Sequence, residues 1–358
     1  MERKEIENLR FEILDSVNNP KSIHGIYPYR GKISALDAKQ ILEQLPSNIT
    51  LLDPFCGSGT ILYEAQKLGM KTIGVDLNPI AITLSKAKTD NSINENDIIQ
   101  NCNSIINSAK IIDNNWVKLM PDDAIKHFHL DTADEIMRVL LFFDDMCDYL
   151  KAAFFGAIAL SARGCNDYKW TSSTVGKNIE PKRYINFYDK FIYKCKKHLY
   201  INSGNKKSEI IKHDSRRLKE IIKEKSVDVV FTSPPYFDAL DYTAYYAKII
   251  YDILGEDRLT IKEDLIQKVS TYKESMQEVL RQIEYVTKDD AIIIFVVGDK
   301  KSKGDLISGG EYFADIHYRK PLLIKEREYK GSSSQVFDKL NNTKRKEQIV
   351  VWHKQSGA

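Results

Sequence analysis

The sequence predicts an α/β fold, in which helices pack on an open parallel sheet. Three observations lead to this prediction. Two short apolar runs, 48–53 and 71–76, each end on an acid, as buried parallel strands often do. A glycine-containing loop and a segment of helical period, 61–68, lie between them. A longer apolar run, 291–297, is typical of a further buried strand in the same sheet.

Composition limits the function classes. The 358 residues are enough for one large domain or two small ones, and 42% of them are hydrophobic, as in soluble globular proteins. Because the formal net charge is only +3, a nucleic-acid-binding surface must be a local patch. Five cysteines without a CxxC pair, and no secretion signal, predict a reducing cytoplasm. The longest apolar run, 152–160, is far shorter than the ~20 residues of a membrane span.

The loop at 53–60, Asp-Pro-Phe-Cys-Gly-Ser-Gly-Thr, has the position of a cofactor loop. Gly57 and Gly59 permit a sharp turn and a close approach of a ligand to the backbone. The following helix should end at Gly69, and the next strand delivers Asp76, close to the ~20 residues after the turn at which a ribose-binding acid is expected. The pattern therefore predicts a nucleotide-type cofactor, against the alternative of an ordinary glycine turn.

These residues also carry a family resemblance. The 53–60 run resembles motif I of the S-adenosylmethionine-dependent DNA amino-methyltransferases, and Thr232-Ser-Pro-Pro-Tyr236 resembles their motif IV. The resemblance covers roughly 20–90 and 205–300 and is strongest for the DNA cytosine-N4 methyltransferases. It implies a Rossmann-like methyltransferase fold with a mainly helical inserted target-recognition domain. The loop has one glycine fewer than a dinucleotide fingerprint, which suits a cationic cofactor without a pyrophosphate.

The resemblance implies a set of residues that bind S-adenosylmethionine. The segment 24–32 resembles motif X, which helps to cradle the methionine end of the cofactor, and Asp214 stands where motif III could accept a hydrogen bond from the adenine amino group. The expected cofactor-binding residues are His24, Tyr29, Asp53, Pro54, Phe55, Gly57, Gly59, Thr60, Asp76, Leu77 and Asp214.

Motif IV implies the catalytic residues Ser233, Pro234, Pro235 and Tyr236. In the resembling family, the hydroxyl at position 233 and the backbone carbonyl of Pro234 accept the two protons of the base amine. The two prolines stiffen the loop, so these acceptors are positioned in advance. Tyr236 would stack on the base, which must first be flipped out of the duplex.

The rest of the chain supplies the framework. Residues 1–20 predict an amphipathic helix outside the core, and further helices are expected from Ser34, over 80–87 with Pro79 at the first position, over 239–253 and over 261–286. The remaining strands are expected at 209–214, 227–231, 322–325 and 348–352.

The interval 91–206 is too long for an ordinary connection and predicts an inserted domain. The catalytic domain then comprises 1–90 and 207–358. The second half of the insertion, 163–197, mixes basic and aromatic residues, which neutralise phosphates and contact bases, although a solvated helix face has a similar composition. The expected DNA-binding residues are Lys169, Lys177, Lys182 and Arg183.

The resulting hypothesis is a DNA cytosine-N4 methyltransferase of a restriction-modification pair. Its partners are double-stranded DNA and a cognate restriction endonuclease, with no membrane. No metal is expected, because His127 and His129 lack a ligand-spaced partner, and cytosine-C5 chemistry would need a Pro-Cys loop that the chain lacks. The alternatives are a DNA adenine-N6 enzyme, an RNA guanine-N2 or protein-glutamine methyltransferase, and a silent cofactor- and DNA-binding subunit.

Overall fold

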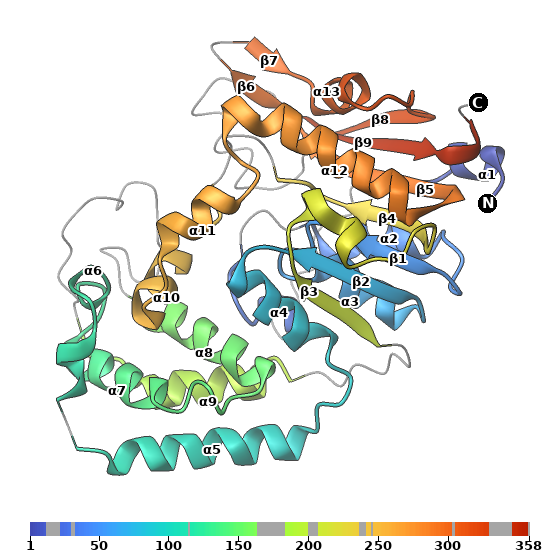
Figure 1. Ribbon diagram of the computed structural model, residues 1–358. Helices are drawn as coiled ribbons and strands as arrows, with labels where there is room; N and C mark the ends of the chain where they lie inside the picture. The colour runs from blue at the N-terminus through green and yellow to red at the C-terminus, as the bar shows by residue number, and fades with distance from the viewer. Residues whose placement is uncertain are drawn as a thin grey trace.

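The computed structural model describes residues 1–11, 22–29, 33–113, 115–162, 183–199, 207–235, 241–244, 246–302, 305–328 and 346–356. These residues form a seven-stranded sheet of order β3-β2-β1-β4-β5-β9-β8 (Figure 1). The first five strands of this order are parallel, and β9 runs antiparallel to both of its neighbours. The strands are β1 Thr50–Asp53, β2 Lys71–Asp76, β3 Ser208–Lys212, β4 Val227–Thr232, β5 Thr287–Gly298, β8 Leu323–Glu328 and β9 Lys346–His353. A separate short hairpin pairs β6 Lys300–Ser302 with β7 Asp305–Ile307.

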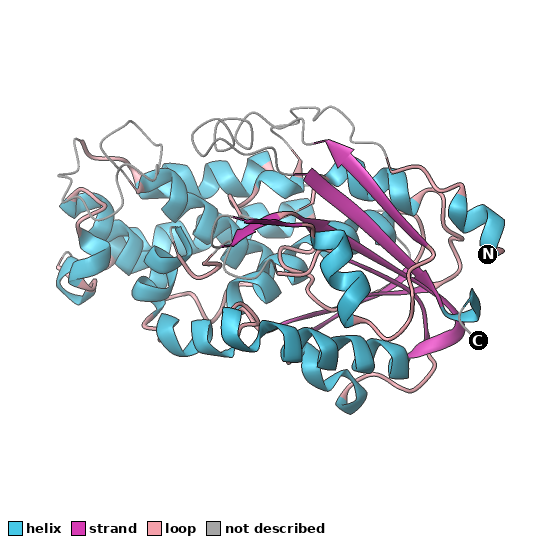
Figure 2. Cartoon of the chain, turned by 90° about the horizontal axis from the view of Figure 1, so that it is seen from above, coloured by secondary structure: helices cyan, strands magenta, loops and turns pink. Residues whose placement is uncertain are grey.

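Helices cover both faces of the sheet, and the order of side chains along β5 explains why. Ile292 and Ile294 belong to one hydrophobic cluster, whereas Ile293 and Phe295 belong to another. Because successive side chains of a strand point to opposite faces, this alternation creates two separate apolar surfaces. Figure 2 shows helices along both sides of the sheet. The first cluster is completed by α1 Arg3–Glu7, α2 Ala35–Leu42 and α3 Thr60–Lys67, and the second by η4 Ser215–Glu220, α12 Tyr272–Val286 and α13 Gly309–Ile316.

The insertion between β2 and β3 is helical, as expected. It follows α4 Pro79–Thr89 and comprises α5 Glu95–Ile111, η2 Trp116–Leu119, α6 Asp122–Ile125, α7 Leu130–Leu140, α8 Asp148–Ser161 and α9 Phe187–Lys197. Its aromatic core, with Phe154, Phe187 and Phe191, is continuous with Ile80 and Leu84 of α4 and with Ile250 of α10 Tyr246–Leu254. The insertion is therefore packed onto the nucleotide-type fold through a shared hydrophobic core. Its assignment as a separate recognition domain stays a prediction.

Three helix predictions need correction. The predicted helix 261–286 is two helices, α11 Arg258–Asp264 and α12, separated by a non-α segment in which η5 is Val269–Thr271. Leu265 and Ile266 leave the helix and line a cavity beside the motif IV loop, so tertiary contacts override the apolar period. The expected helix at 239–253 begins at Tyr246. Within 1–11 the amphipathic segment is helical only over α1, and residues 12–20 lie outside the described ranges.

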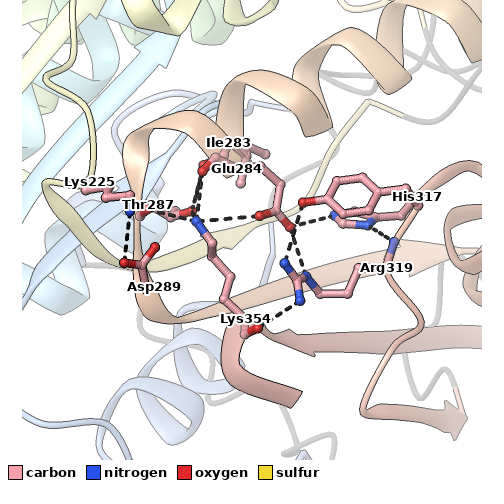
Figure 3. Close-up of polar contacts among 9 residues, drawn as sticks. Lys225, Ile283, Glu284, Thr287, Asp289, His317, Arg319 and Lys354 are labelled. Carbon is pink, nitrogen blue, oxygen red and sulfur yellow. Dashed lines mark hydrogen bonds and ion pairs between the residues drawn. The ribbon is translucent and has the colours of Figure 1, made fainter. Parts of the chain in front are cut away.

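A buried ion network lies at the amino end of β5, where α12 ends (Figure 3). Glu284 near the end of α12 forms ion pairs with Arg319 at 3.3 Å and with Lys354 at 3.5 Å, and its carboxylate lies 3.4 Å from the Nε2 atom of His317. The Lys354 ammonium also donates to the carbonyls of Glu284 at 2.9 Å and Thr287 at 3.0 Å. A cation at these carbonyls stabilises the carboxyl end of α12, because the helix dipole is negative there. The network thus ties α12 to the segments that flank β8 and β9.

No helix in the described part of the chain is both long enough and apolar enough to cross a membrane.

Candidate active site

The motif I loop turns sharply between β1 and α3. Gly57 and Gly59 have φ values of +50° and +72°, in the left-handed region that favours glycine. A Cβ atom at Gly59 would lie 2.8 Å from the Cα atom of Ser85 in α4, so this turn also packs against the neighbouring helix. The Ser85 hydroxyl donates to the Gly57 carbonyl at 2.8 Å and so links the loop to α4. Both glycines are therefore required by geometry, as the sequence indicated.

The acid at the end of β2 fixes the backbone of this turn by hydrogen bonds. The Asp76 carboxylate accepts from the backbone N–H of Gly57 at 2.8 Å and from that of Asn78 at 2.9 Å. Asn78 caps α4, and its Oδ1 atom also accepts from the Tyr251 hydroxyl at 2.6 Å. Each carboxylate oxygen retains a further lone pair, so Asp76 can still accept from a ligand hydroxyl.

The motif I and motif IV loops are joined directly. The Thr232 hydroxyl at the end of β4 donates to Asp53 Oδ1 at 2.6 Å, and the N–H of Phe55 donates to the same oxygen at 3.2 Å. The Tyr272 hydroxyl at the start of α12 donates to the Pro235 carbonyl at 2.6 Å. These bonds place Ser233 beside the glycine turn, although the two motifs are about half the chain apart.

Two adjacent cavities lie at the carboxyl ends of the parallel strands, where ligands bind in open α/β sheets. The larger one has a volume of about 630 Å³. Eight of the predicted site residues line it: Tyr29, Phe55, Gly57, Asp76, Leu77, Asp214, Ser233 and Pro235. The smaller one, of about 300 Å³, adds Asp53 and Thr60 and shares Tyr29, Phe55, Gly57 and Ser233. The structure thus brings together residues from motifs X, I, III and IV with Asp76 and Leu77 at the end of β2.

Some predicted residues have other positions. His24 lines neither cavity, and its Nε2 atom is 2.9 Å from Glu64 of α3 while its ring lies edge-on to Tyr63. Pro54, Gly59 and Pro234 belong to the two loops but line neither of these two cavities, and the Pro54 carbonyl accepts from the Ser215 hydroxyl. Arg183 is exposed next to α9. Tyr236, Lys169, Lys177 and Lys182 lie outside the described residues.

Sequence reasoning missed several residues of the site. Tyr242, Leu265 and Ile266 line the larger cavity, together with Asn78, His213 and Ser215. His213 and Ser215 flank Asp214, and Asn78 lies two residues after Asp76, so an extension of the predicted site by one or two residues would have found them. Tyr242 and the 265–266 pair carry no comparable local signal.

The site is acidic. Burial raises the pKa of Asp53 to about 7, although the hydrogen bonds from Thr232 and Phe55 act in the opposite direction. Burial also raises the pKa of Asp76 above its ordinary value. Neither acid forms an ion pair with a basic side chain within the described ranges. Asp214 differs: burial alone would raise its pKa, but the Arg216 guanidinium donates to both carboxylate oxygens and lowers the pKa below the ordinary value.

These features fit S-adenosylmethionine. Its sulfonium and ammonium groups are cationic, and buried acids without a basic partner favour a cationic ligand nearby. Asp76 offers acceptors for ribose hydroxyls, and Phe55 and Leu77 provide apolar walls for an adenine ring. The described residues contain no His, Cys, Asp and Glu group that could hold a metal ion.

Comparison with known proteins agrees with this geometry. The family model described as D12 class N6 adenine-specific DNA methyltransferase matches residues 31–294, which include both loops. The chain is 24% identical to the type II methyltransferase M.MjaII of Methanocaldococcus jannaschii, over 90% of this chain and 79% of the relative. It is 23% identical to M.BsoBI of Geobacillus stearothermophilus, over 84% and 65%, and 25% identical to M.MvaI of Kocuria varians, over 64% and 56%. Both of these are also named type II methyltransferases.

Proposed function

Because the chain belongs to the D12 class of S-adenosylmethionine-dependent DNA methyltransferases, we propose that it methylates an exocyclic base amine of DNA as the modification enzyme of a type II restriction-modification system. One observation carries the proposal. The Asp53–Thr232 hydrogen bond fixes the glycine turn and the Ser-Pro-Pro loop at adjoining cavities. A donor site and an acceptor site that share a wall suit direct group transfer, which depends mainly on alignment.

The cofactor would occupy the larger cavity. Asp76 would accept from the ribose hydroxyls, and Asp214 would accept from the adenine amino group. Phe55 and Leu77 would contact the ring system, and Gly57 would let the backbone approach the methionine moiety. When bound, S-adenosylmethionine supplies an electrophilic methyl group on its sulfonium.

The motif IV loop would act on the base. The lone pair of an exocyclic amine is delocalised into the ring, so the amine is a poor nucleophile. The Ser233 hydroxyl and the Pro234 carbonyl would accept the two amine protons and thereby orient the lone pair. The Tyr272–Pro235 bond keeps the loop in place from the α12 side. Because these acceptors are already positioned, little reorganisation is needed during transfer.

For the target base, Ser233 favours N4 of cytosine. In the resembling family, adenine enzymes usually carry Asp or Asn at this position, whereas cytosine-N4 enzymes usually carry Ser. The second candidate is N6 of adenine, which the description of the matching family favours. Both bases present an amine beside a ring nitrogen, so one pocket chemistry serves either product.

The product decides between these candidates. DNA incubated with the protein and S-adenosylmethionine is digested to nucleosides and analysed by mass spectrometry. N4-methyl-2′-deoxycytidine is expected, and N6-methyl-2′-deoxyadenosine as the sole product would refute the cytosine assignment. DNA binding without any methylated nucleoside would support the silent subunit instead.

Ser233→Ala tests the catalytic loop. It should reduce kcat far more than it reduces S-adenosylmethionine affinity, because the hydroxyl faces the base. Ser104→Ala on the exposed face of α5 is the matched control and should leave both unchanged. Equal turnover by Ser233→Ala and wild type would exclude Ser233 from the reaction.

The insertion would choose the DNA sequence through its basic second half. Replacing Lys182 and Arg183 together should weaken DNA binding and reduce its salt dependence, since each phosphate contact releases counterions. S-adenosylmethionine affinity should be unchanged. Loss of cofactor affinity with intact DNA binding would contradict this division of labour.

A further inference from the structure

We propose that Lys194 and His198 of the insertion are positioning residues for the cofactor cavity. They would act through the loop that carries Tyr29. The inference deepens the proposed function and rests on it, because it assigns to the insertion a role in cofactor binding in addition to target recognition.

Two side chains near the end of α9 donate hydrogen bonds to the backbone of residues 22–25. The Lys194 ammonium donates to the Gly25 carbonyl at 2.9 Å, and His198 Nδ1 donates to the Ser22 carbonyl at 2.8 Å. Lys194 also lies 3.4 Å from His198 Nε2, which can accept in this tautomer. Both side chains are buried, at 6% and 2% exposure, so these bonds are shielded from competing water. A charged donor to a carbonyl is among the stronger hydrogen bonds in proteins.

The same loop is packed into the core of the insertion. Ile23, Ile26 and Tyr27 belong to the hydrophobic cluster of Phe154 and Phe191, which α8 and α9 supply. Gly156 of α8 permits an especially close approach, because a Cβ atom there would lie 2.0 Å from the Ile26 carbonyl oxygen. The loop is thus bound to the insertion by its backbone and by its side chains.

The other end of the loop forms part of the cofactor site. Tyr29 lines both cavities, and its ring would be 3.3 Å from a Cβ atom at Gly57. His24 connects the loop to Glu64 of α3 at 2.9 Å. The segment from Ser22 to Tyr29 is therefore a bridge between α9 and the glycine turn.

This bridge has an energetic consequence. A displacement of α9 relative to the sheet moves the wall formed by Tyr29, so an event at the insertion changes cofactor affinity. By linkage, S-adenosylmethionine must then change DNA affinity by the same factor. The bridge thereby couples target binding with cofactor binding.

Lys194→Met tests the bridge, because it removes the bond to Gly25 and keeps a long apolar side chain. S-adenosylmethionine affinity, measured by calorimetry without DNA, should fall roughly tenfold, because the released loop that carries Tyr29 must then be ordered on binding. The KM for S-adenosylmethionine should rise by a similar factor. The kcat at saturating cofactor and DNA should stay within about twofold of wild type, whereas the effect of S-adenosylmethionine on DNA affinity should be lost. A residue that served only the stability of the insertion would not produce this split.

Lys196→Met on the exposed side of the same helix is the control and should bind S-adenosylmethionine like wild type. Gly156→Ala is the second variant, because the added methyl must push the Ile26 carbonyl away without changing any charge. It should reproduce the loss of cofactor affinity. If circular dichroism shows that Lys194→Met is unfolded, Gly156→Ala alone tests the inference. Folded Lys194→Met or Gly156→Ala protein with wild-type affinity and KM would overturn the inference alone. Wild-type protein that does not bind S-adenosylmethionine would overturn the proposed function as well.

Discussion

The two ends of the parallel strands differ in whether their buried acids have basic partners. At the carboxyl ends, Asp53 and Asp76 are held by hydroxyl and backbone N–H donors, and no ion pair with a basic side chain compensates them within the described ranges. At the amino ends, Glu284 is surrounded by His317, Arg319 and Lys354 (Figure 3). In the part of the chain that the structure describes, the same sheet therefore has two buried acids without a basic partner at one end, and a buried acid with two basic partners at the other.

This difference separates a binding site from a structural junction. Unpaired buried acids cost stability, and a protein retains them where a cationic ligand compensates the charge. The charged groups of the network are satisfied by one another, so they favour no ligand, but they fix the segments that carry them. Substitutions at the amino ends should therefore change folding, and substitutions at the carboxyl ends should change binding.

Removing the central acid of the network should have the largest effect. Glu284→Gln should lower the free energy of unfolding by about 3–5 kcal/mol, because it leaves buried cations with too little counter-charge. Urea unfolding measures the change. The folded variant should bind S-adenosylmethionine with wild-type affinity. A parallel loss of affinity would contradict a purely structural role for the amino ends.

Removing the acid of β2 should have the reverse pattern. Asp76→Ala should weaken S-adenosylmethionine binding by about 1.5–3 kcal/mol for each charge-assisted bond lost to the ribose. Calorimetry on folded protein measures this, with Asp252→Ala in α10 as a control acid that lines neither cavity. Unchanged affinity in Asp76→Ala would remove Asp76 from the site.

The two ends should also respond oppositely to pH. Burial raises the pKa of Asp53 to about 7, so the folded state favours its neutral form. The free energy of unfolding should therefore fall as the pH rises from about 4 to about 7, because the unfolded chain loses this proton first. Burial lowers the pKa of His317 to about 4, so its contribution is lost as the pH falls from about 6.5 to about 4. Urea titrations across this range should show that Asp53→Asn removes the first loss and His317→Phe removes the second. Curves parallel to wild type would show that these groups do not titrate as inferred.

The smallest effect is expected at the edge of the same network. Lys225 and Asp289 form an exposed ion pair at 2.9 Å, with side chains 53% and 73% accessible. Solvent screens such pairs, so Asp289→Asn should not change the urea midpoint measurably. A clear shift would mean that the network extends to the surface.

The sequence was sufficient where local pattern and function coincide. The acid-ended runs predicted β1 and β2, and the glycine spacing predicted the turn with its two positive φ values. It was insufficient where partners are distant in the chain. The Asp53–Thr232 bond spans 179 residues, and no spacing rule relates Glu284 to Lys354. Asp214 was expected to be open to the cofactor, but Arg216 already occupies part of its carboxylate. The break after α11 likewise follows from the cavity that Leu265 and Ile266 line.

The order of strands in the second half of the sheet has a consequence for synthesis. β9, the latest of these strands to be translated, lies between β5 and β8. Until residues 346–353 leave the ribosome, β5 has a free edge of Ile, Phe and Val residues buried on both faces in the finished fold. An unpaired apolar edge of this kind is a template for association with other chains. A nascent chain stopped before β9 should therefore aggregate or engage a chaperone, even though both loops of the active site have already been made.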